Sequence, residues 1–189
     1  MKEDILLHLC CAPCATAVLE DLRADGYEVT GCFYNPSIHP WKEFRRRLDA
    51  VKEWAPSVDL QMIYYEAYPL EDNIRMLLGS DSRCLSCFTD RMKKTAELAT
   101  EMGIGLFTST LSVSPYQNHE LLRRAGETAA ALLDVHYRYK DFRGSYRRSI
   151  ELSRGAGMYR QPYCGCVFSE RDRYSKIKFT GQKEPQIGY

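Results

Sequence analysis

The sequence predicts an α/β fold, a Rossmann-like, doubly wound and mostly parallel sheet with helices on both faces. Two observations lead to this fold class. Short apolar runs alternate along the chain with segments of helical periodicity, as is typical of a parallel sheet with crossover helices. The composition, 44% hydrophobic and 27% charged residues in a chain of 189, is that of a globular protein and excludes wholesale disorder, a collagen-like fibre and a multi-spanning membrane protein.

Each expected element follows from a local pattern. The apolar run 5–9 predicts the first strand, and the helix after it begins at Pro13, a residue suited to a first helical turn, and ends at Gly26. A stripe of apolar residues that starts at Trp41 predicts the next helix, which stops near Pro56. The remaining expected strands span residues 29–34, 60–65, 106–110 and 135–139. The remaining expected helices span residues 69–78, 90–102 and 117–133, with a cysteine-containing turn before 90–102.

The order of these elements predicts where a ligand would bind. Connections of this length and the right-handed crossover rule favour three layers, with ligands beyond the carboxyl ends of the strands. Cys10 and Cys11 stand at such an end, so we expect a cysteine-rich metal site there. The sequence contains no internal repeat, low-complexity tract or linker, and we therefore expect one domain over residues 1–189.

The eight cysteines are the unusual part of the composition. A Cys-x-x-Cys turn lets two thiolates converge on one ion, and a tetrahedral metal or a four-iron cluster uses up to four of them. Cys32 stands alone in an apolar strand and is interpreted as a small buried hydrophobe. The other seven form three groups: Cys10, Cys11 and Cys14; Cys84 and Cys87; Cys164 and Cys166. Seven ligands exceed one site, which implies a second metal or an open redox position.

The types of ligand residue indicate which kinds of metal or redox centre the cysteines could form. Thiolates with few histidines favour iron–sulfur chemistry, while zinc and thiol redox chemistry remain open. Adjacent Cys10 and Cys11 should point in different directions from an extended backbone, so we expect them to serve two neighbouring centres rather than one ion. No export signal and no apolar run long enough for a membrane helix is found, and we expect a cytoplasmic protein with reduced thiols and no membrane partner.

Charge is distributed unevenly along the chain. The whole sequence carries +1, but the segment 136–189 holds twelve Lys/Arg and five Asp/Glu, hence +7. Arginines alternate there with tyrosines, a pattern that suits contact with a phosphate backbone and with unpaired bases, and equally an ordinary solvated helix. A Walker A loop, a Gly-x-Gly-x-x-Gly fingerprint and a Ser-Gly-Gly loop are all absent from the expected positions, which disfavours nucleotide hydrolysis.

Taken together, these motifs resemble the cobalamin-independent epoxyqueuosine reductases, the QueH family. Six separated motifs in the right order carry the resemblance, which spans nearly the whole chain. They are Leu7-His8-Leu9-Cys10-Cys11-Ala12-Pro13-Cys14; Tyr34-Asn35-Pro36 with Ile38-His39-Pro40; Arg83-Cys84 with Cys87; Ser114-Pro115-Tyr116-Gln117; Asp141-Phe142-Arg143; and Gly157-Met158-Tyr159-Arg160-Gln161 with Tyr163-Cys164-Gly165-Cys166.

The resemblance implies the last step of queuosine synthesis, the two-electron deoxygenation of epoxyqueuosine in tRNA. It implies a 4Fe-4S cluster with an additional iron ion, an external electron donor, and the anticodon stem-loop of tRNA as the partner. The expected metal ligands are the seven grouped cysteines. Asp141 is the first candidate for an acid or a carboxylate ligand, and His8 and Asp81 follow as candidates for the acid. Asp141 fits equally an ion pair with Arg143 or Arg138, and His8 inside the first strand fits a hydrogen-bonded core histidine better than a ligand. The expected substrate-binding residues are His39, Tyr116, Gln117, Arg143, Arg147, Arg148, Tyr159 and Arg160.

Two other functions fit part of the pattern. A zinc-stabilised RNA-binding module without catalysis would explain the cysteines and the basic segment but leaves three thiols unused. A thiol–disulfide oxidoreductase would use the Cys84-Leu-Ser-Cys87 motif but does not need the other grouped cysteines. The colour of the protein prepared without air separates these hypotheses, because iron–sulfur centres absorb visible light and zinc and dithiols do not.

Overall fold

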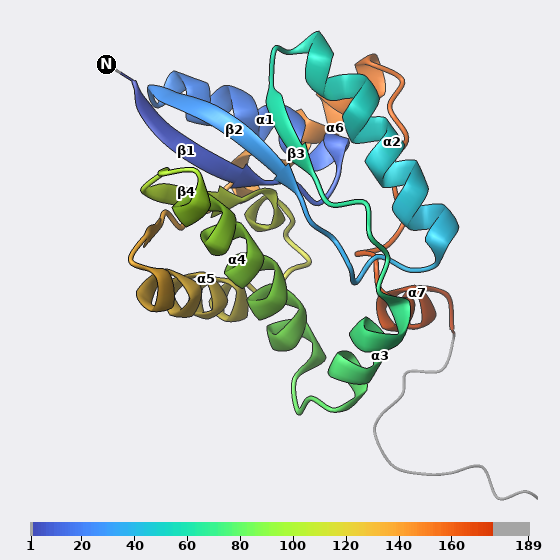
Figure 1. Cartoon of the computed structure of the whole chain (residues 1–189). Helices are drawn as coiled ribbons and strands as arrows, with labels where there is room; N and C mark the ends of the chain where they lie inside the picture. The colour runs from blue at the N-terminus through green and yellow to red at the C-terminus, as the bar shows by residue number, and fades with distance from the viewer. Residues whose placement is uncertain (1, 176–189) are drawn as a thin grey trace, which may run out of the picture.

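A computed structural model of the chain describes residues 2–175, which are built around a five-stranded parallel sheet (Figure 1). The strands are β1 (Glu3–His8), β2 (Tyr27–Phe33), β3 (Gln61–Tyr64), β4 (Leu106–Ser109) and β5 (His136–Tyr137). The α-helices are α1 (Ala12–Ala24), α2 (Trp41–Ser57), α3 (Leu70–Leu78), α4 (Arg83–Glu101), α5 (His119–Leu133), α6 (Tyr146–Gly155) and α7 (Val167–Tyr174), and two short 3-10 helices are η1 (Thr110–Val113) and η2 (Arg143–Ser145). The expected doubly wound α/β fold is confirmed.

The sheet has the strand order β3-β2-β1-β4-β5, with every neighbouring pair parallel. The order reverses between β1 and β4, because the chain first extends the sheet on one side of β1 and then on the other. At this point His8, the last residue of β1, is paired with Cys32 of β2 and Ser109 of β4. Loops that leave β1 and β4 diverge from there, which is the usual place for a ligand in a doubly wound sheet.

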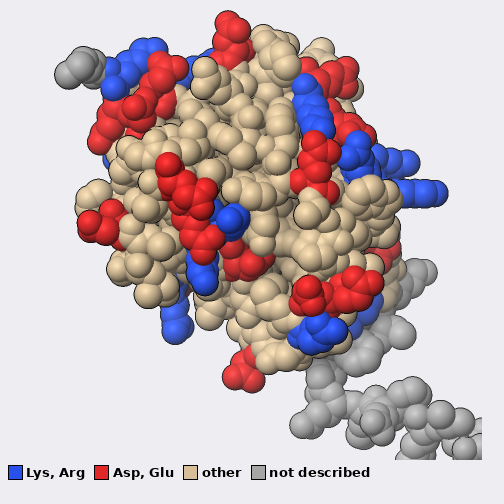
Figure 2. All heavy atoms as spheres, viewed as in Figure 1, with Lys and Arg blue, Asp and Glu red and all other residues tan. Residues whose placement is uncertain are grey.

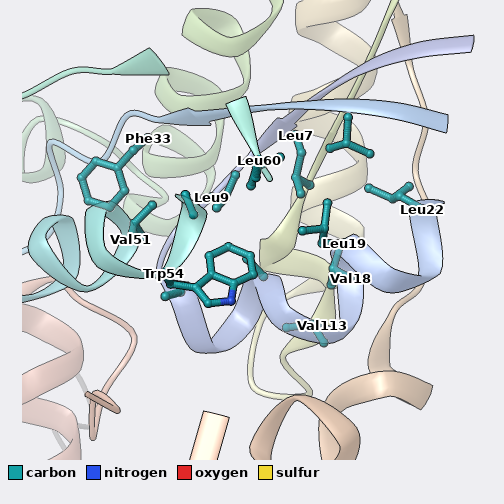
Figure 3. Close-up of a cluster of buried hydrophobic side chains, with 14 of the residues drawn as sticks. Leu7, Leu9, Val18, Leu19, Leu22, Phe33, Val51, Trp54, Leu60 and Val113 are labelled. Atoms are coloured by element: carbon teal, nitrogen blue, oxygen red, sulfur yellow. The ribbon is translucent and has the colours of Figure 1, made fainter. Parts of the chain in front are cut away.

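Helices cover both faces of the sheet. Helices α1 and α2 pack on one face with α6 against α1, and α4 and α5 pack on the other (Figure 1). One hydrophobic core, the first core, lies between the sheet and helices α1 and α2, and the second core lies between the sheet and helices α4 and α5. Because side chains alternate along a strand, Leu7 and Leu9 enter the first core and Leu6 enters the second. Figure 3 shows the first core, in which Leu7 and Leu9 meet residues of α1 and Trp54 of α2. Burial on both faces explains why the middle of β1, residues 5–7, is apolar without alternation.

Helices α6 and α7 follow the last expected strand, where no helix had been assigned, and α4 begins at Arg83 instead of residue 90. Cys84 and Cys87 therefore lie in the first turns of a helix and not in a turn before it. The hydroxyl of Ser82 caps this helix by accepting a hydrogen bond from the amide of Leu85 at 3.4 Å. Burial of Phe88 in the second core adds tertiary support that local propensity did not indicate.

Other boundaries shift by a few residues. The last strand, expected over 135–139, is reduced to His136–Tyr137 at the edge of the sheet. Among residues 2–175 no helix has the length and apolar character needed to cross a membrane. The end of the basic segment, residues 176–189, lies outside the described residues, and the assignment of the whole chain to one domain stays a prediction.

Candidate metal centre

Three cysteine sulfurs converge just beyond β1. Cys10 and Cys11 follow the strand, and Cys14 lies in the first turn of α1. Their Sγ atoms all lie within 4.8 Å of one another, and those of Cys10 and Cys11 are 3.8 Å apart. Within residues 2–175 this triad is the one set of three His, Cys, Asp or Glu side chains whose ligand atoms come so close. Such a set can bind one metal ion.

This convergence corrects the expectation that Cys10 and Cys11 point in different directions. That expectation assumed that the extended backbone of β1 continues through both residues. Instead the chain bends at Cys10 and enters α1 directly after Cys11, the residue that precedes the helix. Pro13 at the helix start fixes the turn. The bend brings the two neighbouring sulfurs to the same side.

The triad shares protons around one sulfur. Hydrogen bonds with the thiols of Cys11 and Cys14, and then with the hydroxyl of Thr110, lower the pKa of Cys10 well below its usual value in spite of burial. Burial and the interaction with Cys10 raise the pKa of Cys11 to about 12, and hydrogen bonds with Cys10 and Cys11 raise the pKa of Cys14. A metal cation bound here would displace the shared protons, because it needs deprotonated thiols.

The other two cysteine groups lie near each other. Burial and then the charges of Cys164 and Cys166 raise the pKa of Cys84. Burial raises the pKa of Cys87 to about 11, with further contributions from Cys164 and Cys166. The guanidinium of Arg83 at the start of α4 lies 4.4 Å from the ring centroid of Phe168 in α7, which joins the two segments. Four sulfurs separate from the triad are thus brought into one neighbourhood.

A buried ion pair fixes the segment that carries Cys164. The side chain of Arg47 on α2 is 1% exposed, and its Nε lies 2.7 Å from a carboxylate oxygen of Glu43. Its other nitrogens donate to the backbone oxygens of Cys164 at 2.8 Å and Tyr163 at 3.1 Å. Arg47 therefore satisfies two buried carbonyls and positions Cys164. Sequence reasoning missed this role, because a basic run on a helix resembles a solvated face.

A cavity of about 550 Å³ adjoins the cysteines. Cys10, Cys14 and Cys164 all line it, so two of the three cysteine groups reach the same space. This volume is within the range of roughly 300–1,000 Å³ that is usual for small-molecule sites. The buried Ser149 hydroxyl and the side-chain oxygen of Gln161 also belong to lining residues, and neither has a hydrogen-bond partner within residues 2–175. Such polar atoms are suited to binding a ligand.

Three of the expected substrate-binding residues line this cavity: Tyr116, Gln117 and Arg160. Tyr116 is 83% exposed at its edge, and Gln117 donates an amide hydrogen bond to the Cys164 sulfur at 3.1 Å. Arg160 donates to the Ser153 hydroxyl at 2.9 Å and to a backbone oxygen of α6.

The other five expected substrate-binding residues are not among the lining residues. His39 is buried and accepts a hydrogen bond from the amide of Val167. Each of the remaining four bonds to an acidic side chain: Tyr159 to Glu43, Arg143 to Asp141, Arg147 to Glu151, and Arg148 to Glu20 and Asp21.

The structure places His8 and Asp141, the two candidates for the catalytic acid, outside the cavity lining. The ring nitrogens of His8 lie 2.9 Å from the Ser109 hydroxyl and 3.0 Å from the Tyr34 carbonyl, and burial lowers the pKa of His8 to about 4. Hydrogen bonds from Arg143 lower the pKa of Asp141 to about 2. At neutral pH the first is a neutral core histidine and the second is a carboxylate without a proton to donate. Asp81 is exposed and outside the cavity lining.

The family model described as "Epoxyqueuosine reductase QueH" matches residues 5–172 of the chain. The chain belongs to the QueH family. Its curated relatives named epoxyqueuosine reductase QueH include the protein from Dehalococcoides mccartyi, 33% identical over 177 residues that cover 93% of this chain and 97% of the relative. The protein from Haemophilus influenzae is 35% identical, covering 97% of this chain and 78% of the relative, and that from Thermotoga maritima is 32% identical, covering 91% and 93%.

A solved structure gives a much weaker likeness. The U34-tRNA thiolase NcsA from Methanococcus maripaludis with its 4Fe-4S cluster covers 100% of this QueH-family chain and 78% of its own, with 9% sequence identity and a TM-score of 0.43. A likeness of this size has no bearing on function.

Two glutamine amides contact the sulfurs of this QueH-family chain. Gln161 donates to the Cys11 sulfur at 3.0 Å and lies 3.9 Å from that of Cys14, while Gln117 contacts Cys164. Sequence reasoning included both glutamines in the family motifs but did not assign Gln161 a role. The structure gives both the position of a hydrogen-bond donor to sulfur, and such donors tune iron–sulfur centres.

Proposed function

We propose that this chain reduces epoxyqueuosine in tRNA to queuosine. Family membership supports this reaction. The observation that links the reaction to particular residues is the cavity lined by Cys10, Cys14 and Cys164. In the overall reaction the epoxide oxygen leaves as water and a ring double bond forms. The balance requires two electrons and two protons for each substrate, and the electrons come from an external donor. Because the thiols must stay reduced, we assign the reaction to the cytoplasm.

We assign the grouped cysteines to two metal centres. The triad would supply three convergent sulfurs to one centre. Cys84, Cys87, Cys164 and Cys166, whose charges interact but of which no three converge within 4.8 Å, would supply the other. The triad contains cysteines only, without a carboxylate or histidine. Thiolates of this kind are the ligands that iron–sulfur centres prefer. When bound, a 4Fe-4S cluster and an additional iron would supply single electrons and a Lewis acid for the epoxide oxygen.

Tyr146 is the residue best placed to protonate the departing oxygen. It begins α6 and lines the cavity, and burial together with the neighbouring Tyr116 and Cys14 raises its pKa. Its phenol therefore holds its proton at neutral pH and can donate it within the cavity. We choose Tyr146 over Asp141 and His8 because neither of these residues lines the cavity.

The remaining lining residues suit a modified nucleoside. The exposed ring of Tyr116 lies 6.2 Å from that of Tyr146 in an edge-to-face arrangement, so it can stack on a base at the cavity edge. The unpartnered oxygens of Ser149 and Gln161 can bond to hydroxyl or amine groups of the substrate. The Gln161 amide then holds sulfur and its oxygen faces ligand, which couples the two parts of the site.

Metal analysis tests this function against its rivals. We expect the protein prepared without air to be brown and to contain about five irons and about four sulfides for each chain, because the seven cysteines exceed the needs of one cluster. Equal amounts of iron and sulfide, about four of each for each chain, would contradict the presence of a second metal centre. Stoichiometric zinc without sulfide would contradict the reductase and favour the zinc-stabilised RNA-binding module.

The anticodon stem-loop of tRNA is the proposed partner. Figure 2 shows acidic and basic side chains interspersed around a broad uncharged surface on the face it presents, so binding to tRNA has to come from particular exposed cations. Arg147 on α6 is 92% exposed, and Arg173 on α7 lines the cavity. In contrast, Arg148 is held by Glu20 and Asp21.

We expect the double variant Arg147→Gln/Arg173→Gln to bind tRNA more weakly, with a shallower dependence of affinity on salt. Each lost phosphate contact lowers the slope of log affinity against log salt by about one unit. Titrations of labelled tRNA at several salt concentrations measure this slope. Arg148→Gln is the control, because its side chain is half-buried and held by two carboxylates of α1, whereas Arg147 is 92% exposed and pairs with one carboxylate, Glu151, of its own helix. If the double variant kept the wild-type slope of log affinity against log salt, the surface that binds tRNA would not include Arg147 and Arg173.

A further inference from the structure

Arg91 is a buried cation beside the cysteines that the proposed mechanism does not use. It lies on α4 at spacings of seven and four residues from Cys84 and Cys87, so the three share one face of the helix. Its side chain is among the largest fully buried ones, with 2% of the residue exposed. A charge this deeply buried needs a partner of opposite sign.

Among residues 2–175 no carboxylate lies within ion-pair distance of Arg91, although the charges of Arg91 and its neighbour Asp90 interact. Arg91 forms no ion pair with an Asp or Glu there, and its Nε has no hydrogen-bond partner. The neighbouring residue Asp90 accepts a hydrogen bond from the Tyr34 hydroxyl instead. Arg47, the other large buried arginine, differs in this respect because its Nε lies 2.7 Å from Glu43.

Cys84 and Cys87 share the α4 face of Arg91, and cysteines are the groups whose charges act most on its guanidinium. Burial lowers the pKa of Arg91, but the charges of Cys87, Cys164, Cys10 and Cys166 raise it, and the net direction is upward. These cysteines come from all three groups, so Arg91 stands at the point where the groups meet. The two histidines whose pKa values Arg91 influences, His8 and His39, are themselves buried and have lowered pKa values, so neither adds a second positive charge.

We propose that Arg91 is the internal counter-cation of the sulfur centre and raises its reduction potential. This inference rests on the cofactor of the proposed function. Reduction adds a negative charge to a centre already surrounded by thiolates, and a fixed positive charge in a dry environment stabilises the reduced form more than the oxidised form. Arg91 thus acts as a positioning residue for electron transfer and contacts no substrate.

The test is the midpoint potential of the iron-loaded, full-length protein, measured in the absence of tRNA. We expect Arg91→Gln to lower the potential by about 59 mV or more, which corresponds to a tenfold change in a one-electron equilibrium. Arg91→Lys keeps the charge and should recover most of this loss. Arg23→Gln is the matched control, because Arg23 bonds the backbone oxygens of Val58 and Asp59 and should leave the potential unchanged.

The outcomes separate this inference from the proposed function. If Arg91→Gln folds but loses iron, retention of iron by Arg91→Lys supports the charge role, and equal loss in both variants overturns it. A wild-type potential in loaded Arg91→Gln also overturns it while leaving the reductase intact. A wild-type protein without a redox-active centre would overturn both, whereas a correct potential shift without epoxyqueuosine reduction would overturn the proposed function alone.

Discussion

Cys14→Ala is expected to lose iron and to lower reductase activity by at least about a hundredfold, the upper end of what substitutions around metal ligands cost. Cys14 belongs to the triad and lines the cavity, so its removal leaves two sulfurs where three converge. Iron, sulfide and activity measured on one preparation test this. Loss of one iron with sulfide retained would assign the triad to the single iron, and loss of about four of each would assign it to the cluster.

Cys32→Ala is the matched control for this experiment. Cys32 is fully buried in the second hydrophobic core, and burial raises its pKa to about 12, so it behaves as an apolar side chain. Its replacement leaves a small cavity and should cost about 1 kcal/mol of unfolding free energy with normal iron content. Full iron and activity in Cys14→Ala would contradict a metal role for the triad, and loss of iron from Cys32→Ala would show that Cys32 had been misinterpreted.

Tyr146→Phe is expected to lower kcat by about 10²–10⁴-fold, the usual contribution of a positioned acid, while iron content and tRNA affinity stay normal. The ring is kept, so its edge-to-face contact with Tyr116 and its place in the cavity wall should persist. Single-turnover reduction of epoxyqueuosine-containing tRNA measures the loss without the contribution of product release.

Asp141→Asn is the companion variant, because the sequence proposed Asp141 for the same role. Its carboxylate is 40% exposed and paired with Arg143, and surface pairs of this kind contribute about 0–1 kcal/mol. We therefore expect nearly normal kcat and stability. The reverse result, with Tyr146→Phe active and Asp141→Asn inactive, would identify Asp141 and not Tyr146 as the proton donor.

Local patterns were enough to predict most of the fold. The apolar run of β1, the helical periodicity after it and the alternation of the two along the chain predicted a doubly wound sheet with Cys10 and Cys11 at a strand end, and the structure confirms this arrangement. These features depend on residues within a few positions of each other. The start of α4 was wrong because Phe88 is buried by distant segments, and local propensity does not contain that burial.

The sequence by itself determined the family and the three groups of cysteines, because the motifs and the ligand spacing are written in the order of residues. Only the tertiary structure decided that three of the sulfurs converge, that Tyr146 lines the cavity while His8 and Asp141 do not, and that Arg91 is buried near cysteines without an ion-paired carboxylate. Convergence, burial and charge balance are set by contacts between segments up to about 150 positions apart, such as Gln161 on Cys11. The free energies of packing and desolvation that stabilise such contacts depend on the whole fold, so local sequence patterns do not contain them.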